Sequence, residues 1–255
     1  MNKIFRLCAF AISLTLVSPA VGFAATGEVI AVIQQAQIQS DGTRKVLEMG
    51  APVLSGDIIQ TNRRGEAQLL FPDKTRIVVG PGSTLVLERT LFNSNNKAQR
   101  FVVNAVGGTY RFISGESRKS RYKIKTPTAT MGIRGTAFDF TVTDTETTVL
   151  MYEGIVNLCA RDSHCARLSE TCSSVIIDVE ELFSQPGTDR EHLQLLQERF
   201  PYRDGQIRLR ADFRTRMSNN QCEDRVETAD LPQGSAPSAP SRAAGESESD
   251  GDGNP

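Results

Sequence analysis

Apolar and polar residues alternate along much of the stretch from residue 26 to about residue 158. A period of two places every second side chain on one face of an extended strand, so each run predicts a strand with one buried face. About a dozen short strands without intervening helices indicate an all-β fold: a sandwich, a barrel or a solenoid-like coil of strands. The apolar members of the clearest runs are Ala67, Leu69 and Phe71; Ile77 and Val79; Leu85 and Leu87; Tyr110 and Phe112; Tyr122 and Ile124; Phe138, Phe140 and Val142; and Leu150 and Tyr152.

Turn residues separate these runs. Glycine readily adopts a positive φ, and Asp, Ser and Pro favour turn geometry for their own reasons. We therefore expect turns at Asp41-Gly42, Ser55-Gly56-Asp57, Pro72-Asp73, Gly80-Pro81-Gly82, Gly107-Gly108, Ser114-Gly115 and Glu153-Gly154.

One short helix is predicted between residues 178 and 200. Leu193, Leu196 and Phe200 recur at helical spacing, and Thr188 is a suitable N-cap residue. From Leu231 onward the sequence has almost no apolar residues beyond alanine and proline, and it ends in acidic, Gly-rich sequence. Such a tail cannot bury a core, so we expect it to be disordered.

The N-terminus has the pattern of a secretory signal peptide. Lys3 and Arg6 precede an almost wholly apolar run at residues 7–18, and Gly22-Phe23-Ala24 offers small residues at a cleavage site. We expect cleavage after Ala24 and a periplasmic or secreted protein with no membrane span. The alternative is an uncleaved anchor, but a spanning helix needs about 20 apolar residues. Cys8 lies inside the apolar run rather than at its end, which argues against lipidation.

These boundaries predict four parts. They are a signal peptide (1–24), a β domain (25–158), a cysteine-containing extension with one short helix (159–230) and a disordered acidic tail (231–255). Removal of Lys3 and Arg6 shifts the formal net charge from −1 to −3. A chain so close to neutral has no polyanion-binding character overall, so we expect no nucleic-acid partner.

Four cysteines remain after cleavage: Cys159, Cys165, Cys172 and Cys222. An even number in an exported chain favours disulfides, and the spacing lacks the C-x2-C pairs of zinc sites. The residues between Cys159 and Cys165 resemble a hairpin tip, which predicts a local bridge there and a long bridge from Cys172 to Cys222. Four cysteines allow three connectivities, so the other pairings remain open.

Six segments, taken in order, resemble the FecR-domain family over residues 27 to about 158. They read GEVIAVIQQAQIQ, GAPVLSGDIIQT, GEAQLLFPDKTRIVVGPGSTLVL, GGTYRFISG, KIKTPTATMGIRGTAFDFTV and VLMYEGIVNL. The most characteristic part is Thr126-Pro127 followed by Gly132-Ile133-Arg134-Gly135-Thr136. Lys74 departs from the pattern, because it stands at a turn position usually given to glycine.

The same segment can be interpreted from its residues alone. Pro127 cannot donate to a strand ladder, which indicates a strand end or an edge. Gly132 and Gly135 permit a positive φ or a close backbone approach, as a strand crossing between two layers would need. Arg134 is interpreted first as a structural guanidinium that caps open carbonyls, and alternatively as a clamp for an anion or carboxylate of a partner.

Catalytic chemistry is poorly represented in the sequence. The chain has only two histidines, His164 and His192, and no G-x-S-x-G, H-E-x-x-H or P-loop pattern. The acid pairs Glu180-Glu181 and Asp139 with Asp144 are interpreted as solvated surface residues. We therefore expect no enzyme activity, no metal and no cofactor.

Three functions remain. The leading hypothesis is a non-enzymatic binding module that recognises another envelope protein, for example by strand addition. The resemblance implies a second possibility, a signalling or sensing component of FecR type. The third is binding of cell-wall glycan, which would favour exposed aromatic residues, whereas the chain has no Trp and four Tyr.

Overall fold

The computed structural model describes residues 26–160, 164–180, 183–185, 189–216 and 222. The predicted signal peptide with its cleavage site, the proposed N-cap Thr188 and the predicted tail from Leu231 lie outside the described residues. In the part of the chain described, no helix is long and apolar enough to cross a membrane.

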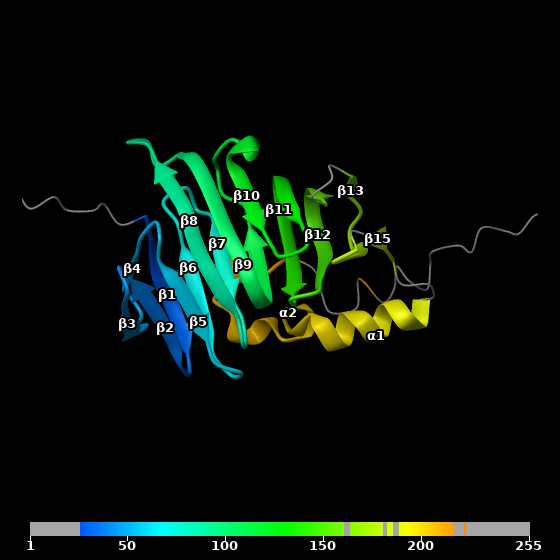
Figure 1. Cartoon of the computed structure of the whole chain (residues 1–255), viewed down its shortest axis with the longest axis horizontal. Coiled ribbons are helices and arrows are strands. Elements are labelled where there is room, and N and C mark those ends of the chain that lie inside the picture. Colours follow the sequence, from blue (N-terminus) through cyan, green and yellow to red (C-terminus); the bar gives the residue numbers. More distant parts are fainter. Residues whose placement is uncertain (1–25, 161–163, 181–182, 186–188, 217–221, 223–255) are drawn as a thin grey trace, which may run out of the picture.

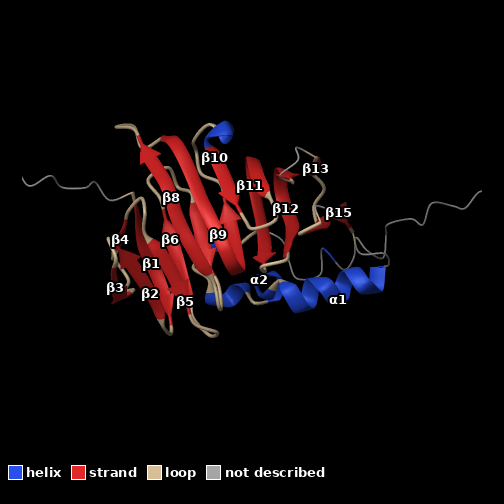
Figure 2. Cartoon of the chain, viewed as in Figure 1, coloured by secondary structure: helices blue, strands red, loops and turns tan. Residues whose placement is uncertain are grey.

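The fold is all-β, as the alternation predicts, with short helices near the C-terminal end (Figure 2). The strands are β1 (Gly27–Ile33), β2 (Ala36–Ser40), β3 (Thr43–Val46), β4 (Pro52–Val53), β5 (Ile58–Thr61), β6 (Glu66–Leu70), β7 (Arg76–Val79), β8 (Thr84–Phe92), β9 (Ala98–Ile113), β10 (Tyr122–Lys125), β11 (Thr130–Val142), β12 (Glu146–Cys159), β13 (Cys165–Leu168), β14 (Ser174–Asp178) and β15 (Phe183–Ser184). The helices are α1 (Asp189–Arg199) and α2 (Pro201–Asp204), with 3-10 turns η1 (Lys119–Arg121), η2 (Gln206–Arg208) and η3 (Ala211–Phe213). The predicted helix is therefore present as α1.

Hydrogen bonding divides these strands into two layers that share three long strands. In the first layer, β3, β2, β5 and β8 lead to the first half of β9, followed by β10, the first half of β11, the second half of β12 and β13. In the second layer, β4, β1, β6 and β7 lead to the second half of β9, followed by the second half of β11, the first half of β12, β14 and β15. The arrangement is a sandwich whose layers are joined through bent strands (Figure 1).

Glycines with positive φ mark the bends. Gly108 in β9 has φ 108°, Gly135 in β11 has φ 66°, and Gly154 in β12 has φ 89°. A Cβ added at Gly154 would overlap the carbonyl oxygen of Gly135, so two bends lie against each other. The turns expected at Gly107-Gly108 and Glu153-Gly154 are therefore wrong, because both pairs lie inside continuous strands. A positive φ there redirects the strand instead of ending it.

Other turn predictions are confirmed. Asp41 and Gly42 have φ 47° and 78° and connect β2 to β3, as in a two-residue hairpin turn. Lys74 has φ 67° at the turn between β6 and β7. The lysine thus adopts the left-handed conformation that glycine would adopt more readily.

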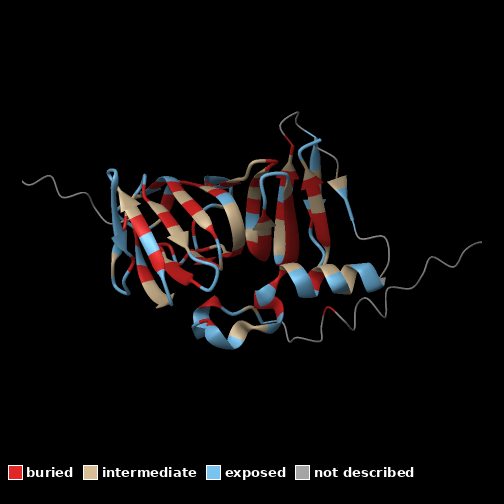
Figure 3. Cartoon of the chain, turned by 60° about the horizontal axis from the view of Figure 1, so that its bottom comes forward, coloured by how far each residue is buried: buried red, intermediate tan, exposed pale blue. Residues whose placement is uncertain are grey.

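The inward side chains of both layers form one core. Buried residues alternate with more exposed ones along the strands (Figure 3). Phe101 on the first layer contacts Phe71 and Phe112, with ring centroids 4.8 and 6.2 Å apart. Aromatic side chains therefore join the two layers at the centre of the core.

The C-terminal segment of residues 189–216 covers the outer face of the second layer (Figure 1). Leu196 and Phe200 pack with Leu150 and Tyr152 of β12. Farther along, Tyr202, Leu209 and Phe213 pack with Val78 of β7, and the last described segment reaches Ile30 and Leu70. The extension beyond residue 158 also supplies β13, β14 and β15 to the same sheet. The domain boundary at 158 stays a prediction.

A buried ion pair anchors this segment. Arg111 Nε donates to Asp139 Oδ1 at 2.7 Å, and both side chains are fully buried. The same guanidinium donates to the carbonyl of Tyr202 at 2.9 Å and to the side-chain oxygen of Gln206 at 2.7 Å. Burial alone lowers the pKa of Arg111, but the charge and hydrogen bonds of Asp139 raise it overall above its ordinary value. The expectation that Asp139 is a solvated surface acid is therefore wrong, whereas Asp144 is exposed.

The structure contains two disulfides, and they join the same pairs of cysteines that the sequence predicts. Cys159 and Cys165 join β12 to β13, and Cys172 is bridged to Cys222 across a sequence separation of 50. Both Cys172 and Cys222 are buried with the side chains that lie under α1. The long bridge therefore ties the end of the C-terminal segment to the β sandwich.

We expect Gly154→Ala to lower the free energy of unfolding by about 3 kcal/mol, because Ala is strained at this φ and its Cβ meets the backbone of Gly135. Gly132→Ala is the matched control, since nothing lies within 4 Å of a Cβ there. It should change stability by less than about 1 kcal/mol. Urea unfolding measures both, and equal effects would contradict the close approach of the two bends.

Asp139→Asn should cost about 3–5 kcal/mol, because it leaves the buried guanidinium of Arg111 without a counter-charge. The double variant Arg111→Met with Asp139→Leu removes both charges and should cost less than the single change. A single variant within about 1 kcal/mol of the wild type would show that the pair is not needed to hold the C-terminal segment.

The two disulfides should stabilise different parts of the molecule. By the chain-entropy account, a loop of the length closed by Cys172 and Cys222 contributes about 4 kcal/mol and the short loop about 2–3 kcal/mol. Replacing Cys172 and Cys222 with Ser should speed amide exchange throughout residues 196–213. Replacing Cys159 and Cys165 should speed it only in β12 and β13. Equal exchange in the two double variants would contradict this division.

Candidate interaction surface

The residues of the characteristic segment lie in three places. Thr126 and Pro127 form the turn between β10 and β11, Gly132 and Arg134 lie on β11 in the first layer, and Gly135 and Thr136 lie at the bend. Pro127 is thus at a strand end, as predicted, and Gly135 has the expected positive φ. Gly132 has neither a positive φ nor a close neighbour, so the expectation for this glycine is wrong.

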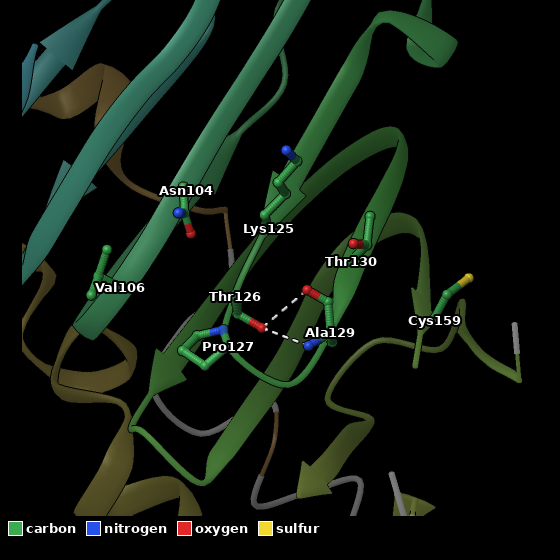
Figure 4. Close-up of a pocket in the computed structure, with 8 residues that line it drawn as sticks. All are labelled: Asn104, Val106, Lys125, Thr126, Pro127, Ala129, Thr130 and Cys159. Atoms are coloured by element: carbon green, nitrogen blue, oxygen red, sulfur yellow. Dashed lines mark hydrogen bonds between the residues drawn. The ribbon is translucent and has the colours of Figure 1, made fainter. Parts of the chain in front are cut away.

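Hydrogen bonds fix the β10–β11 turn. Thr126 Oγ1 accepts from the backbone N–H of Ala129 at 3.0 Å and donates to the carbonyl of Ala129 at 3.2 Å (Figure 4). The backbone N–H of Thr126 also donates to this carbonyl at 2.9 Å. Beneath the turn, the hydroxyl of Thr147 contacts those of Thr126 and Thr128, each at 2.8 Å. Three threonine hydroxyls therefore support a turn that is otherwise short and proline-containing.

A hollow of about 290 Å³ lies beside this turn on the outer face of the first layer. Asn104, Lys125, Thr130 and Cys159 are consecutive cross-strand neighbours on β9, β10, β11 and β12. Figure 4 shows these side chains around the hollow together with Val106, which is 41% exposed. The hollow is open and mixed in polarity, and it holds no set of groups that resembles a catalytic centre.

Arg134 is exposed, and its guanidinium has no hydrogen-bond partner in the part of the chain that the structure describes. It does not cap backbone carbonyls, so the interpretation favoured from the sequence is wrong. The positive φ of Gly135 provides the bend of β11, and the arginine side chain is exposed to solvent. Thr136 is buried at the bend, where its backbone N–H donates to Ser114 Oγ at 3.0 Å.

Arg134 belongs to a group of cations that share the outer face of the first layer. Register places Arg89, Val102, Lys123, Gly132, Asn157 and Arg167 in one row across β8 to β13. The alternating positions of the same strands add further cations on this side. We define the cationic face as Arg89, Arg100, Arg121, Lys123, Lys125, Arg134 and Arg167.

The charges of the cationic face are almost unopposed. Lys125 pairs with Glu88 at 2.8 Å. The other six members have no ion pair with any residue that the structure describes. A hollow of about 380 Å³ near the centre of the face is lined by Arg100, Arg121, Lys123 and Lys125 and by no acidic residue. Clustered charges of one sign attract and orient an oppositely charged partner.

Sequence reasoning missed this surface, because the net charge of the whole chain is close to zero. A local sequence signal for this surface was nevertheless present. Arg121, Lys123 and Lys125 alternate with buried residues, which puts three cations on the solvent side of β10 and of the turn before it. The other four come from β8, β9, β11 and β13, so only the strand register brings them together.

The two histidines and the acid pair Glu180-Glu181, which the sequence does not assign to a catalytic site, lie in separate places where the structure describes them. His164 is exposed near the β12–β13 connection, whereas His192 Nε2 lies 3.1 Å from Ser174 Oγ under α1. Glu180 is exposed and Glu181 lies outside the described residues. Among the residues described, no group of three or more His, Cys, Asp or Glu side chains could hold a metal ion.

Comparison with known proteins gave one family and a few solved structures. The family model described as FecR protein matches residues 57–157. Crystal structures of a "putative anti-sigma factor" from Parabacteroides distasonis ATCC 8503 are similar at a TM-score of 0.41 and 17% identity. The match covers 50% of this chain and 59% of that one. A cell surface anchoring domain is similar at a TM-score of 0.23 and 30% identity, covering 24% of this chain and 80% of that one. No curated protein matches the chain.

Both TM-scores lie below 0.5, so neither likeness assigns a function. The family match is more informative, because it runs from β5 to β12 and includes the three bends and most of the cationic face. It confirms the resemblance over the end of the second segment and over the last four of the six segments, while residues 27–56 lie outside it. The chain therefore carries a FecR domain, which the family match places at residues 57–157.

Proposed function

We propose that this protein is a non-catalytic component of FecR type that acts outside the cytoplasm, where it takes part in sensing by binding another envelope protein through its cationic face. The observation that carries the proposal is the set of six cations without ion pairs on the open side of the FecR domain. From the sequence alone, a general binding module ranked above a sensing role. The FecR match now favours the sensing role, and binding is the physical act that it requires.

The position of the cationic face supports its use in binding. The second layer is covered by residues 189–216, which bury its outward side chains. The cationic face lies on the other layer, where Arg100, Lys123 and Arg134 are exposed on three adjacent strands. A strand surface with many long cationic side chains fits an acidic partner surface, since each ion pair alone contributes little and several together give specificity.

Protein is favoured over glycan as the partner. Glycan-binding surfaces use exposed aromatic rings, whereas all four tyrosines, Tyr110, Tyr122, Tyr152 and Tyr202, are buried and the chain has no Trp. The cationic face offers guanidinium and ammonium groups instead, which donate hydrogen bonds to carboxylates.

A location outside the cytoplasm is supported by the two disulfides, because such bonds persist in oxidising compartments. The signal-like N-terminus points the same way. A non-catalytic role is supported by the contacts of the buried acid Asp139. Its carboxylate accepts hydrogen bonds from Arg111 and Tyr152, so it is held in a structural ion pair.

The proposal is tested by capture of envelope proteins on the immobilised protein, followed by identification of those retained at moderate salt. Arg121→Glu with Lys123→Glu should abolish capture of the partner. The matched control is Arg63→Glu with Arg64→Glu, which changes the net charge equally at an exposed turn away from the cationic face. The control should capture the partner as the wild type does.

Capture that survives reversal of Arg121 and Lys123, or that falls equally in the control, would overturn the assignment of the binding surface. Sedimentation with peptidoglycan provides the comparison for glycan. Retention on peptidoglycan that depends on the same two residues would replace the protein partner with a glycan partner.

A further inference from the structure

The cationic face has a repeat along its central strand. Lys123 and Lys125 lie two residues apart on β10, and Arg121 precedes the strand as the last residue of the 3-10 turn η1. Side chains at alternate positions of a strand project from one face about 6.4–6.8 Å apart. All three residues line the hollow of about 380 Å³ together with Arg100 on β9. The face therefore presents Lys123 and Lys125 at the spacing of an extended backbone, with Arg121 and Arg100 beside the same hollow.

The C-terminal residues of the same chain carry the complementary repeat. Glu246, Glu248, Asp250 and Asp252 occupy alternate positions, separated only by Ser and Gly. In an extended backbone, four carboxylates would point to one side at the same spacing of about 6.4–6.8 Å. Residues 223–255 contain eight acids and two arginines, so their formal charge is −6.

The length of chain between the two repeats allows them to meet. Cys222 is held to the sandwich by its disulfide with Cys172, whose backbone N–H donates to Met151 of β12. From Cys222 to Glu246 there are 24 residues, which can span up to about 80 Å. That reach exceeds the thickness of two packed β layers several-fold, since sheets pack about 10 Å apart.

We propose that the acidic repeat at residues 246–252 docks on the cationic face of its own chain, in line with Arg121, Lys123 and Lys125. The contact is electrostatic, because Ser and Gly between the acids offer no apolar surface. It is therefore strongest at low ionic strength and is screened as salt rises. Tethering makes the contact intramolecular, with an effective concentration in the millimolar range.

This contact would regulate the binding site, a consequence that rests on the proposed function. A partner with acidic groups competes with the tethered repeat for the same cations, so only a partner that binds more tightly than the repeat gains access. The repeat thus raises specificity by excluding weakly acidic surfaces. An acidic segment of another protein, or the repeat of a second copy, would use the same geometry, and the experiment separates these cases.

The test uses the full mature chain with a spin label at Gly253→Cys and observes backbone amides by NMR at 20 mM salt. The amides of Arg100, Lys123 and Lys125 should be broadened more than twofold relative to the reduced label, and the broadening should disappear at 0.5 M salt. Arg121→Glu with Lys123→Glu should abolish it, whereas the control Arg63→Glu with Arg64→Glu should leave it unchanged.

A matched pair of C-terminal variants tests the spacing of the acids. One replaces Glu246, Glu248, Asp250 and Asp252 with Ser and should lose the broadening. The other replaces Glu223, Asp224, Glu227 and Asp230 with Ser and should keep it, although the net charge changes equally. Absence of broadening at low salt, or equal loss in both variants, would overturn the proposal. Broadening of an isotope-labelled chain by spin label on an unlabelled chain would assign the contact to a second copy and overturn it as well.

Failure here is distinguishable from failure of the proposed function. With the partner identified by capture, the variant lacking the repeat should bind it several-fold more tightly than the wild type. Unchanged affinity overturns the regulatory contact but leaves a cationic face that still captures the partner. Broadening as expected, together with capture that is unchanged by reversal of Arg121 and Lys123, would overturn the proposed function and leave the regulatory contact. The repeat would then dock on a face that the partner does not use.

Discussion

The close approach of Gly135 and Gly154 is the constraint on which the rest of the fold depends. Both residues have a positive φ, which strains any residue with a Cβ, and a Cβ at Gly154 would also overlap the carbonyl oxygen of Gly135. The two glycines let β11 and β12 bend together, so the pair passes from the first layer to the second without losing its register on either side. With the bend of β9 at Gly108, these crossings allow one continuous sheet to enclose its own core.

Bending one sheet into two layers creates two outer faces, of which one is covered by the C-terminal segment and the other is exposed. On the second layer, a row of outward residues contains Val78, Arg111, Asp139 and Leu150. Its apolar members and its ion pair become buried only because residues 189–216 lie over them. On the first layer the corresponding row contains Lys123, Gly132 and Asn157, which need no cover. The extension thus protects the face that requires burial and leaves the charged face free for a partner.

The sequence was sufficient where the signals are local. Alternation predicted the strands, the Asp41-Gly42 turn predicted a hairpin, and the short spacing of Cys159 and Cys165 predicted their bridge. Gly154 was misplaced in a turn because a positive φ serves a turn and a bent strand equally. Asp139 was misplaced on the surface because its partner Arg111 is 28 residues away and the C-terminal cover comes from beyond residue 188. The cationic face was missed because strand register, which a single sequence does not reveal, brings together residues from five strands and from the turn η1 before β10.

The near-neutral net charge conceals how the acids are distributed. Asp57 and Asp73 are buried and accept hydrogen bonds from neighbouring backbone and hydroxyl groups, and Asp139 is held by Arg111. Burial raises the pKa of Glu66 above its ordinary value, which favours its neutral form in the fold. A further eight acids follow Cys222. Asp57, Asp73 and Asp139 thus balance part of the formal charge count without lying beside the cations of the first layer. The electrostatic character of a protein surface therefore depends on where its acids are used internally, and here that use leaves Arg100, Lys123 and Arg134 unopposed on one face.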